Sequence, residues 1–290
     1  MKLSILTPTY NRQYTLPKLY NSLLNQTCKD FEWVIVDDGS LDDTKKLVNS
    51  YIKQNKIRIR YFYKENGGKH RALNYGMQYI DSTLTFIVDS DDWLIPSAVQ
   101  EIISIYDKYK NNSNIACYSF HRMYPDGRIS GPNYKNNEFV DNYINYRINN
   151  HIMGEGSEVV LTSKMKEIPF LEIPNEKFLS EGYFWMKLAL KYDTVYIDKP
   201  IYVFNYLDDG LTKNLLKLRK NNPIGVVEVQ KLYFNSKVGI IPKIKSMIKY
   251  IAYGKLAKYK VSDLYKNINC KMLFIFSFLL GNIYYIKNCR

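Results

Sequence analysis

The sequence FIVDSDDWLIP at residues 86–96 places three carboxylates, those of Asp89, Asp91 and Asp92, directly after a short apolar run. Such a run is typical of a buried strand. Since side chains alternate along a strand, Asp89 and Asp91 are expected to point the same way where the strand ends. Carboxylates this close repel one another unless a cation lies between them, and their oxygens suit Mg²⁺ or Mn²⁺ bound together with substrate phosphates. The stretch therefore predicts a divalent ion that holds a phosphorylated substrate.

The same acidic turn also has a purely structural interpretation. Aspartate is a favourable residue at a helix N-terminus, and a helical pattern follows Pro96. On this interpretation the three carboxylates cap that helix and bind nothing. The rest of the sequence has to decide between the two.

Apolar periodicity in the first 120 residues predicts alternating strands and helices. Ser40 is expected to open the second helix, with Asp43 as its capping partner. The order of elements favours an α/β fold with a doubly wound, mostly parallel sheet and helices on both faces. Strand patterns lie at 3–6, 31–36, 57–63 and 84–88, and helical patterns at 16–24, 40–52 and 73–80.

The net charge of +13 is concentrated at the C-terminal end. Residues 213–290 carry 16 Lys and Arg against two acidic residues, a net charge of +14, whereas residues 1–212 carry 25 basic and 26 acidic residues, a net of −1. Such asymmetry is typical of a separate functional surface. We expect an α/β half at 1–120, a second half of the same domain at 121–215, and a basic helical extension at 216–290.

Several classes of protein lack support in the sequence. The four cysteines show no C-x-x-C spacing, so neither a zinc site nor a disulfide framework is expected. The N-terminal apolar run is too short for a signal peptide, and the apolar segment 272–286 is shorter than the roughly 20 residues that cross a bilayer. Kinase and dehydrogenase motifs are absent: there is no G-x-x-x-x-G-K-[ST] loop and no dinucleotide fingerprint.

Polar segments follow each of the four predicted strands. Because ligands of open α/β sheets bind at the carboxyl ends of the strands, these segments are expected at one shared edge. Tyr10 offers a ring for stacking on a nucleobase, and Asp38 can accept hydrogen bonds from a base or a ribose. Gly67 lets the backbone approach a ligand closely, and Lys69 brings positive charge to a diphosphate. The segments are TPTYNR at 7–12, DDGS at 37–40, NGGKH at 66–70 and DSDD at 89–92.

The motifs SILTPTYNR, FEWVIVDDGS, ENGGKHRALNYG and FIVDSDDWL, in this order and spacing, resemble family 2 glycosyltransferases of the GT-A fold. The resemblance is strong over residues 1–120 and continues more loosely to about 215. It implies a nucleotide-diphospho-sugar donor, Mn²⁺ or Mg²⁺ at a D-x-D motif, and inversion at the anomeric carbon. It implies metal ligands at Asp89 and Asp91, with Asp92 a close alternative to Asp91. The expected donor-binding residues are Pro8, Thr9, Tyr10, Arg12, Asp38, Gly67, Lys69, Asp89 and Ser90.

The family's catalytic base is expected in FLSEGYFWMKLAL, residues 178–190. Gly182 replaces the usual second carboxylate, which leaves Glu181 as the acid of the motif and the expected base. The alternative is a glutamate in the first turn of a helix, where the helix dipole favours it. His70 is expected to be structural or to face a phosphate, and residues 206–212 resemble a family loop that can close over the diphosphate.

The resemblance implies an inverting transfer of one sugar. Metal and Lys69 neutralise the diphosphate, the anomeric carbon gains oxocarbenium character, and Glu181 takes a proton from an acceptor hydroxyl. The Q-x-x-R-W signature of processive synthases is absent. The expected function is a glycosyltransferase using a UDP-sugar in surface-polysaccharide biosynthesis, with residues 1–120 binding the donor and 121–215 the acceptor. The alternative is a catalytically degenerate nucleotide-sugar-binding protein, which the Gly182 departure favours.

The basic segment 240–290 interleaves lysine with apolar residues. It is either a packed helical segment with a solvated lysine face or an interfacial segment that meets anionic lipid. The second interpretation predicts a peripheral protein at the cytoplasmic face of the inner membrane, where a glycan or lipid-linked acceptor would lie. Nucleic acid is not an expected partner, because no RRM, KH or helix-turn-helix signature accompanies the charge.

Overall fold

A computed structural model describes residues 1–134, 136–205, 213–234 and 237–290. The loop predicted at 206–212 lies outside these described residues. The chain divides into two compact units that alternate along the sequence. The first comprises residues 1–142, 153–169 and 191–205, and the second comprises 143–152, 170–190 and 206–290.

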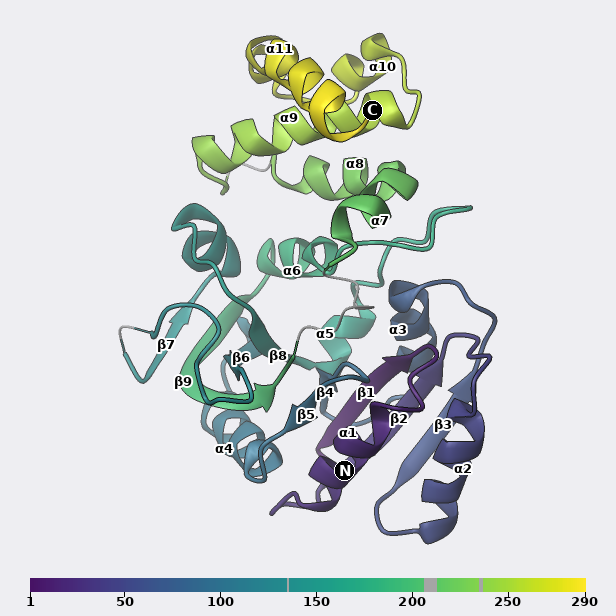
Figure 1. Ribbon diagram of the computed structural model, residues 1–290. Coiled ribbons are helices and arrows are strands. Elements are labelled where there is room, and N and C mark those ends of the chain that lie inside the picture. The colour runs from purple at the N-terminus through teal and green to yellow at the C-terminus, as the bar shows by residue number, and fades with distance from the viewer. Residues whose placement is uncertain (135, 206–212, 235–236) are drawn as a thin grey trace. The chain divides into compact units, whose positions relative to one another are not determined.

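The described part of the first unit forms one nine-stranded sheet in the order β3-β2-β1-β4-β8-β6-β9-β5, with β7 paired to β9 (Figure 1). Strand β1 pairs in parallel with β2 and β4, and β2 pairs in parallel with β3. The register places Thr9 opposite Asp37, and Asp37 opposite Tyr63, so these strands end at one edge. The strands are β1 (Leu3–Thr9), β2 (Phe31–Asp37), β3 (Ile59–Tyr63), β4 (Leu84–Ile87), β5 (Trp93–Leu94), β6 (Ile115–Met123), β7 (Glu138–Asp141), β8 (Gly156–Leu161) and β9 (Asp193–Val203).

Helices cover both faces of this sheet. Ile5 points into a core cluster with apolar residues of α1, α2 and α4. The next residue, Leu6, points to the opposite face and meets α3, because strand side chains alternate. A Cβ built on Gly76 of α3 would lie 2.6 Å from Leu6 Cδ1 and 2.8 Å from Val36 Cγ2, so only glycine permits this close packing. The helices of the first unit are α1 (Leu16–Leu24), α2 (Thr44–Gln54), α3 (Lys69–Met77), α4 (Ala98–Tyr109) and α5 (Thr162–Lys166).

The α/β class predicted from the sequence is confirmed. Strands β1–β4, which the apolar periodicity predicted, form the parallel part of the sheet. The later strands make the sheet mixed. Strand β8 pairs antiparallel with both β4 and β6, and β9 pairs antiparallel with β5 and β7 but parallel with β6. These later strands complete the sheet on the side of β4, and their residues gave no alternating pattern that could assign a direction.

The predicted start of the second helix is wrong. Helix α2 begins at Thr44 with Asp43 at its N-cap. Ser40 belongs instead to the preceding loop, where its N–H donates to Asp37 Oδ1 at 2.7 Å. Its hydroxyl accepts a hydrogen bond from the Asn11 N–H at 2.8 Å. Ser40 therefore ties two loops together and caps no helix.

The structural interpretation of the acidic turn is also wrong. Helix α4 begins at Ala98 with Ser97 at its N-cap, and Glu101 is the acidic residue of its first turn. The carboxylates of the turn precede strand β5, which separates them from α4. They do not cap the helix after Pro96, so another reason is needed for their clustering.

The second unit is helical in its described residues. Ile144, Met186 and Val238 form one apolar cluster, and residues of α8, α9, α10 and α11 form another around Tyr250 and Phe274. Within the described ranges, no helix has the length and hydropathy required to pass through a bilayer. The elements are the π-helical turn η1 (Ile144–Asn149), α6 (Gly182–Ala189), α7 (Leu215–Asn221), α8 (Pro223–Leu232), α9 (Ile240–Leu256), α10 (Val261–Lys266) and α11 (Lys271–Asn288).

Candidate active site

The loops that follow β1 and β2 are joined by hydrogen bonds. The Asp38 N–H donates to the Thr9 carbonyl at 2.8 Å. The Asn11 N–H donates to Ser40 Oγ at 2.8 Å, and the Asn11 side-chain oxygen accepts from the Leu41 N–H at 2.8 Å. The first two polar segments predicted from the sequence therefore lie side by side at the carboxyl edge of the sheet.

Asp38 anchors the third segment to the second. Its carboxylate accepts hydrogen bonds from the N–H groups of Gly67 at 2.9 Å and Gly68 at 2.7 Å. It also accepts from Asn66 Nδ2 at 3.2 Å and from Lys64 Nζ at 2.7 Å. Four donors occupy the four lone-pair positions of a carboxylate, and the side chain is buried. Asp38 therefore positions the glycine loop, and a contact from its carboxylate to a donor nucleoside would require one of these donors to move.

Lys69 and Asp89, which the sequence placed on separate loops, form an ion pair. Gly68 precedes α3 with a φ of +98°, a conformation that glycine adopts readily. Helix α3 begins at Lys69, whose Nζ lies 2.5 Å from Asp89 Oδ1. Burial disfavours the charged form of Asp89, but the Lys69 ammonium and two nearby guanidinium groups outweigh it and lower the pKa of this carboxyl. The third and fourth polar segments thus meet through opposite charges.

Tyr202 of β9 holds the acidic turn through two hydrogen bonds. The Tyr202 hydroxyl donates to Asp92 Oδ2 at 2.7 Å and accepts from the Asp89 N–H at 3.0 Å. Tyr202 and Asp92 are both buried. Burial, followed by the charges of Asp89 and Asp91, raises the pKa of Asp92 to about 8. The turn therefore holds three carboxyl groups close together where they are poorly solvated, which disfavours the ionisation of all three at once.

Asp91 is the carboxylate of the turn that is left without a hydrogen-bonded side-chain partner among the described residues. Burial and the charge of Asp89 raise its pKa. No group of three or more metal-ligating side chains converges anywhere in the described part of the chain. Asp89 is paired with Lys69, and Asp92 with Tyr202. The donor chemistry nevertheless fits Mg²⁺ or Mn²⁺, which often bind proteins through one or two carboxylates and take further ligands from phosphates.

Thr9 is the last residue of β1 at the same edge, and Tyr10 follows it. Thr9 Oγ1 is buried and has no hydrogen-bond partner among the described residues. Leaving a buried hydroxyl unsatisfied costs about 1–3 kcal/mol, so this atom marks a position that a polar ligand atom would stabilise. The Tyr10 ring that follows is 44% exposed and available for stacking. Pro8 is buried within β1 opposite Val36.

Arg12 and Ser90 complete the predicted donor-binding set. Arg12 Nη1 donates to the Tyr14 hydroxyl at 3.0 Å. Its positive charge favours the ionised forms of Asp89 and Asp91, which adds to the lowering of the Asp89 pKa and offsets part of the rise in the Asp91 pKa. Ser90 is buried within the acidic turn. The structure thus brings the predicted residues of the first unit to one edge of the sheet.

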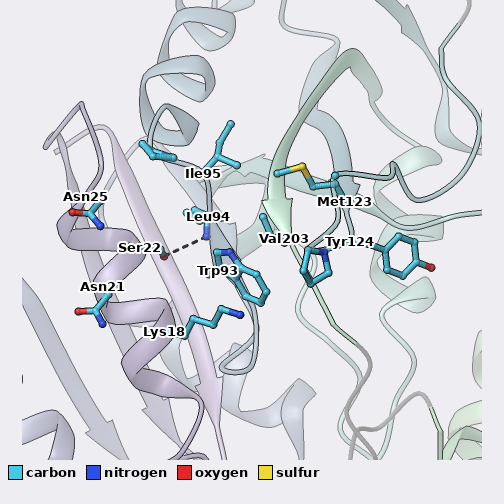
Figure 2. A pocket seen from close by; sticks show the side chains of 13 residues that line it. Lys18, Asn21, Ser22, Asn25, Trp93, Leu94, Ile95, Met123, Tyr124 and Val203 are labelled. Carbon is cyan, nitrogen blue, oxygen red and sulfur yellow. Dashed lines mark hydrogen bonds between the residues drawn. The ribbon is translucent and has the colours of Figure 1, made fainter.

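A pocket of about 450 Å³ opens next to β5. Figure 2 shows Lys18 and Asn21 of α1, with Asn25 at the C-cap of that helix, on one side and Trp93 of β5 facing them. The Lys18 ammonium lies 3.2 Å from the centroid of the Trp93 ring, a cation–π contact. Trp93 directly follows Asp92 in the chain. None of the donor-binding residues predicted in the first unit is among the residues described as lining this pocket, so it is separate from the donor-binding set.

A family model matches the segment that builds this edge. Residues 4–165, more than half of the chain, match the family described as glycosyl transferase family 2. The chain belongs to glycosyl transferase family 2. The match includes all of β1 but its first residue, strands β2–β4 and the four polar segments, of which the acidic turn is the last. It confirms the family resemblance of the sequence motifs.

Two curated relatives of this chain come from bacteria. An uncharacterised glycosyltransferase of Rickettsia typhi is 29% identical over 221 residues, which cover 73% of this chain and 65% of the relative. A GalNAc(5)-diNAcBac-PP-undecaprenol beta-1,3-glucosyltransferase of Campylobacter jejuni is 36% identical over 104 residues, which cover 35% of this chain and 33% of the relative. The chain therefore spans less than two thirds of the length of either relative.

Solved glycosyltransferase structures share the fold. TarS 1–349 of S. aureus, in complex with UDP-GlcNAc, superposes with a TM-score of 0.67 at 18% identity and covers all of this chain and 90% of that one. The mannosyltransferase PcManGT of Pyrobaculum calidifontis, in complex with GDP-Man and Mn²⁺, gives a TM-score of 0.59 at 14% identity, covering 98% of this chain and 87% of that one. The expected GT-A fold with a helical C-terminal region is confirmed.

Three residues of this candidate site lie outside every motif predicted from the sequence: Lys64, Arg122 and Tyr202. The Arg122 side chain is only 14% exposed, and its guanidinium carbon lies 4.3 Å from the centroid of the Tyr202 ring. Burial opposes the charge of Arg122, but Tyr202 and nearby acidic groups outweigh it and raise the pKa of the guanidinium. Because β6 and β9 are distant from the acidic turn in sequence, no local pattern could have identified Arg122 or Tyr202.

Glu181 lies in the second unit, at the N-cap of α6. Its carbonyl accepts a hydrogen bond from the Phe184 N–H at 2.9 Å. This position at the start of an aromatic helix agrees with the predicted motif, and it also agrees with the alternative in which the helix dipole favours a glutamate. His70 is buried in α3, which agrees with the structural role expected for it.

Proposed function

We propose that this protein is an inverting glycosyltransferase that moves one sugar from a nucleotide-diphospho-sugar to a hydroxyl of a glycan or lipid-linked acceptor. The observation that carries the proposal is the Lys69–Asp89 ion pair at the carboxyl edge of the sheet. The pair joins a cation suited to phosphate with an acidic turn suited to a divalent ion. The same edge of the sheet carries the buried Thr9 hydroxyl, which lacks a partner among the described residues. UDP is the proposed nucleotide, since TarS, which shares the fold, is described in complex with UDP-GlcNAc.

In the proposed donor complex, the edge of the sheet holds the nucleotide. The exposed Tyr10 ring stacks on the base, and Thr9 Oγ1 bonds a polar atom of the nucleoside. Asp38 keeps the glycine loop in place for this contact through its bonds to Gly67 and Gly68. Lys69 exchanges part of its interaction with Asp89 for the diphosphate, where its charge stabilises the leaving group.

Mn²⁺ or Mg²⁺ is the proposed cofactor. Asp91 would hold the ion, helped by Asp89 or Asp92 once either gives up its present partner. When bound, such an ion supplies Lewis-acid stabilisation of the diphosphate as it leaves. The chain's own part is to supply carboxylates that are close to one another and poorly solvated, because such carboxylates favour a cation over bulk water.

Glu181 is the proposed general base. It would accept the proton of the acceptor hydroxyl while the oxygen attacks the anomeric carbon from the face opposite the diphosphate, which inverts that centre. A positioned base contributes about 10²–10⁴-fold to the rate. Its place before the aromatic helix α6 supports this role.

A membrane-linked acceptor is the proposed partner. The Campylobacter relative acts on an undecaprenol-linked glycan, and residues 213–290 of this chain carry a net charge of +14. A basic segment binds anionic lipid surfaces with about 1 kcal/mol for each nearby lysine or arginine. We therefore place the protein peripherally at the cytoplasmic face of the membrane, in the synthesis of a surface polysaccharide.

The test is a panel of nucleotide sugars assayed for donor hydrolysis and for transfer, with wild-type protein, Asp91→Asn and Glu181→Gln. We expect both variants to lose transfer, whereas only Asp91→Asn loses metal-dependent donor binding. Wild-type protein that binds a nucleotide sugar but never cleaves it would favour the second candidate, a degenerate binding protein, for which Gly182 in the base motif is the supporting observation.

A further inference from the structure

Helix α11 presents a continuous apolar face to solvent. Phe276 and Leu279 at its centre are 74% and 70% exposed. At about 100° per residue, the exposed apolar residues fall within an arc of about 140° that runs the length of the helix. A large apolar patch on the solvent-exposed side of a helix is typical of an interaction site. The residues of this face are Met272, Ile275, Phe276, Leu279, Leu280, Ile283 and Ile286.

The opposite face of α11 is buried against the rest of the second unit. Phe274, Ser277 and Gly281 are buried on that side. A Cβ built on Gly281 would lie 2.8 Å from two side-chain carbons of Ile251 in α9, so the two helices pack closely. The helix is therefore apolar all round but buried on one side, and only its outer face is available to a partner.

Positive charge is concentrated in the segment that contains this face. Residues 240–290 contain ten Lys and Arg against one Asp, a net charge of +9. Lys271 and Lys287 lie at the two ends of α11, and both are exposed. Neither of them, nor Lys258, Lys260 or Lys266, forms an ion pair with another described residue. Their charges are available to an anionic partner.

Charge distinguishes between possible occupants of the face. A second copy of the chain, pairing through the same face about a two-fold axis, would bring two segments of +9 together, and like charges across an interface oppose binding. An anionic bilayer offers acyl chains to the apolar face and phosphate groups to the flanking lysines. Lysine stems can also lie along the apolar surface while their ammonium groups reach the headgroups.

We propose that the outer face of α11 is a membrane-docking surface that lies in the plane of an anionic bilayer, with its seven apolar residues below the headgroups. The helix, about 27 Å long at 1.5 Å per residue, can only lie flat because its other face is packed on α9. This inference deepens the proposed function, since it specifies which surface would bring the enzyme to a lipid-linked acceptor.

The test uses the full chain and vesicles of either pure phosphatidylcholine or a mixture with about one-third phosphatidylglycerol. Sedimentation at physiological salt measures the bound fraction. We expect wild-type protein to bind the mixed vesicles and not the neutral ones. The double variant Phe276→Gln/Leu279→Gln should bind at least about tenfold more weakly, because two large apolar side chains no longer enter the bilayer.

A matched control removes two exposed apolar side chains from the first unit, in Ile52→Gln/Met153→Gln. This control variant should bind mixed vesicles as the wild-type protein does. Both double variants should have the melting temperature of the wild-type protein. The proposal is overturned if wild-type protein fails to bind the mixed vesicles, or if the α11 variant binds them equally well. It is also overturned if light scattering finds a wild-type dimer that the α11 variant dissociates.

Donor hydrolysis in the absence of vesicles separates this inference from the proposed chemistry. We expect the α11 double variant to hydrolyse donor at the wild-type rate. Wild-type protein that binds vesicles but hydrolyses no donor would contradict the proposed function and support the docking surface. Wild-type protein that hydrolyses donor but does not bind vesicles would contradict the docking surface and leave the proposed function standing.

Discussion

The hydroxyl of Tyr202 lies 2.7 Å from the carboxylate of Asp92, at the end of the acidic turn. The same hydroxyl accepts a hydrogen bond from the Asp89 N–H, at the start of the turn. One side chain of β9 thus fixes both ends of the acidic turn. The partners are 110 residues apart in sequence. The geometry of the proposed metal site therefore depends on the completion of the sheet by its last strand.

Tyr202→Phe is expected to lower the free energy of unfolding by about 1–3 kcal/mol, since it leaves Asp92 and the Asp89 N–H without their buried partner. The turn should also lose its fixed shape, so Mn²⁺ should stimulate donor binding less than in the wild type. Chemical denaturation and donor titration measure the two effects. Tyr118→Phe is the control, because Tyr118 is buried in the same core and its hydroxyl makes no hydrogen bond among the described residues. Equal behaviour of the two variants would refute the role of Tyr202.

Asp38→Asn should loosen the glycine loop. The amide keeps the shape of the carboxylate, but an N–H₂ group in place of Oδ1 would face two donors, the Gly67 N–H and the Lys64 ammonium. We expect the unfolding free energy to fall by about 2 kcal/mol and the KM for donor to rise. Asp43→Asn removes an exposed charge from the same region and should change neither quantity. A normal KM in Asp38→Asn would show that the loop does not need this anchor.

The Lys69–Asp89 pair should show a measurable coupling energy. In a double-mutant cycle of Lys69→Met and Asp89→Asn, we expect a coupling of about 1 kcal/mol in unfolding free energy. The pair is about three-quarters buried, and removal of Lys69 alone leaves Asp89 facing two other carboxylates. A coupling within error of zero would mean that solvent screens the pair fully. The charge-retaining variant Lys69→Arg should preserve most of the stability.

Gly76→Ala should destabilise the protein although alanine favours helices. The added Cβ would meet side chains of Leu6 and Val36 at less than 3 Å, and overpacking of this kind costs about 1–3 kcal/mol. Thermal unfolding measures the effect. Gln78→Ala, an exposed position at the end of the same helix, serves as the control. A stabilised Gly76→Ala variant would contradict the close packing of α3 on the sheet.

Local patterns were sufficient to predict strands β1–β4 and the polar segments that follow them, because each signal lies within a few residues. They misplaced the start of α2, since a tertiary bond from Asn11 holds Ser40 in its loop. They missed Tyr202 and Arg122, which reach the acidic turn only when β6 and β9 join the sheet. They also could not assign the two faces of α11, because that helix is apolar all round and only packing on α9 distinguishes them.

The account depends on Asp91 and its neighbours binding a cation that in turn binds a diphosphate, and calorimetric titration tests this most directly. UDP-N-acetylglucosamine and a panel of other nucleotide sugars would be titrated into wild-type protein and Asp91→Asn, with and without Mn²⁺ or Mg²⁺. We predict that the metal strengthens the binding of at least one donor to wild-type protein by at least about tenfold, which corresponds to about 1.4 kcal/mol. The metal should not change the affinity of Asp91→Asn for that donor. Donor affinities that neither metal alters in the wild-type protein would contradict the account.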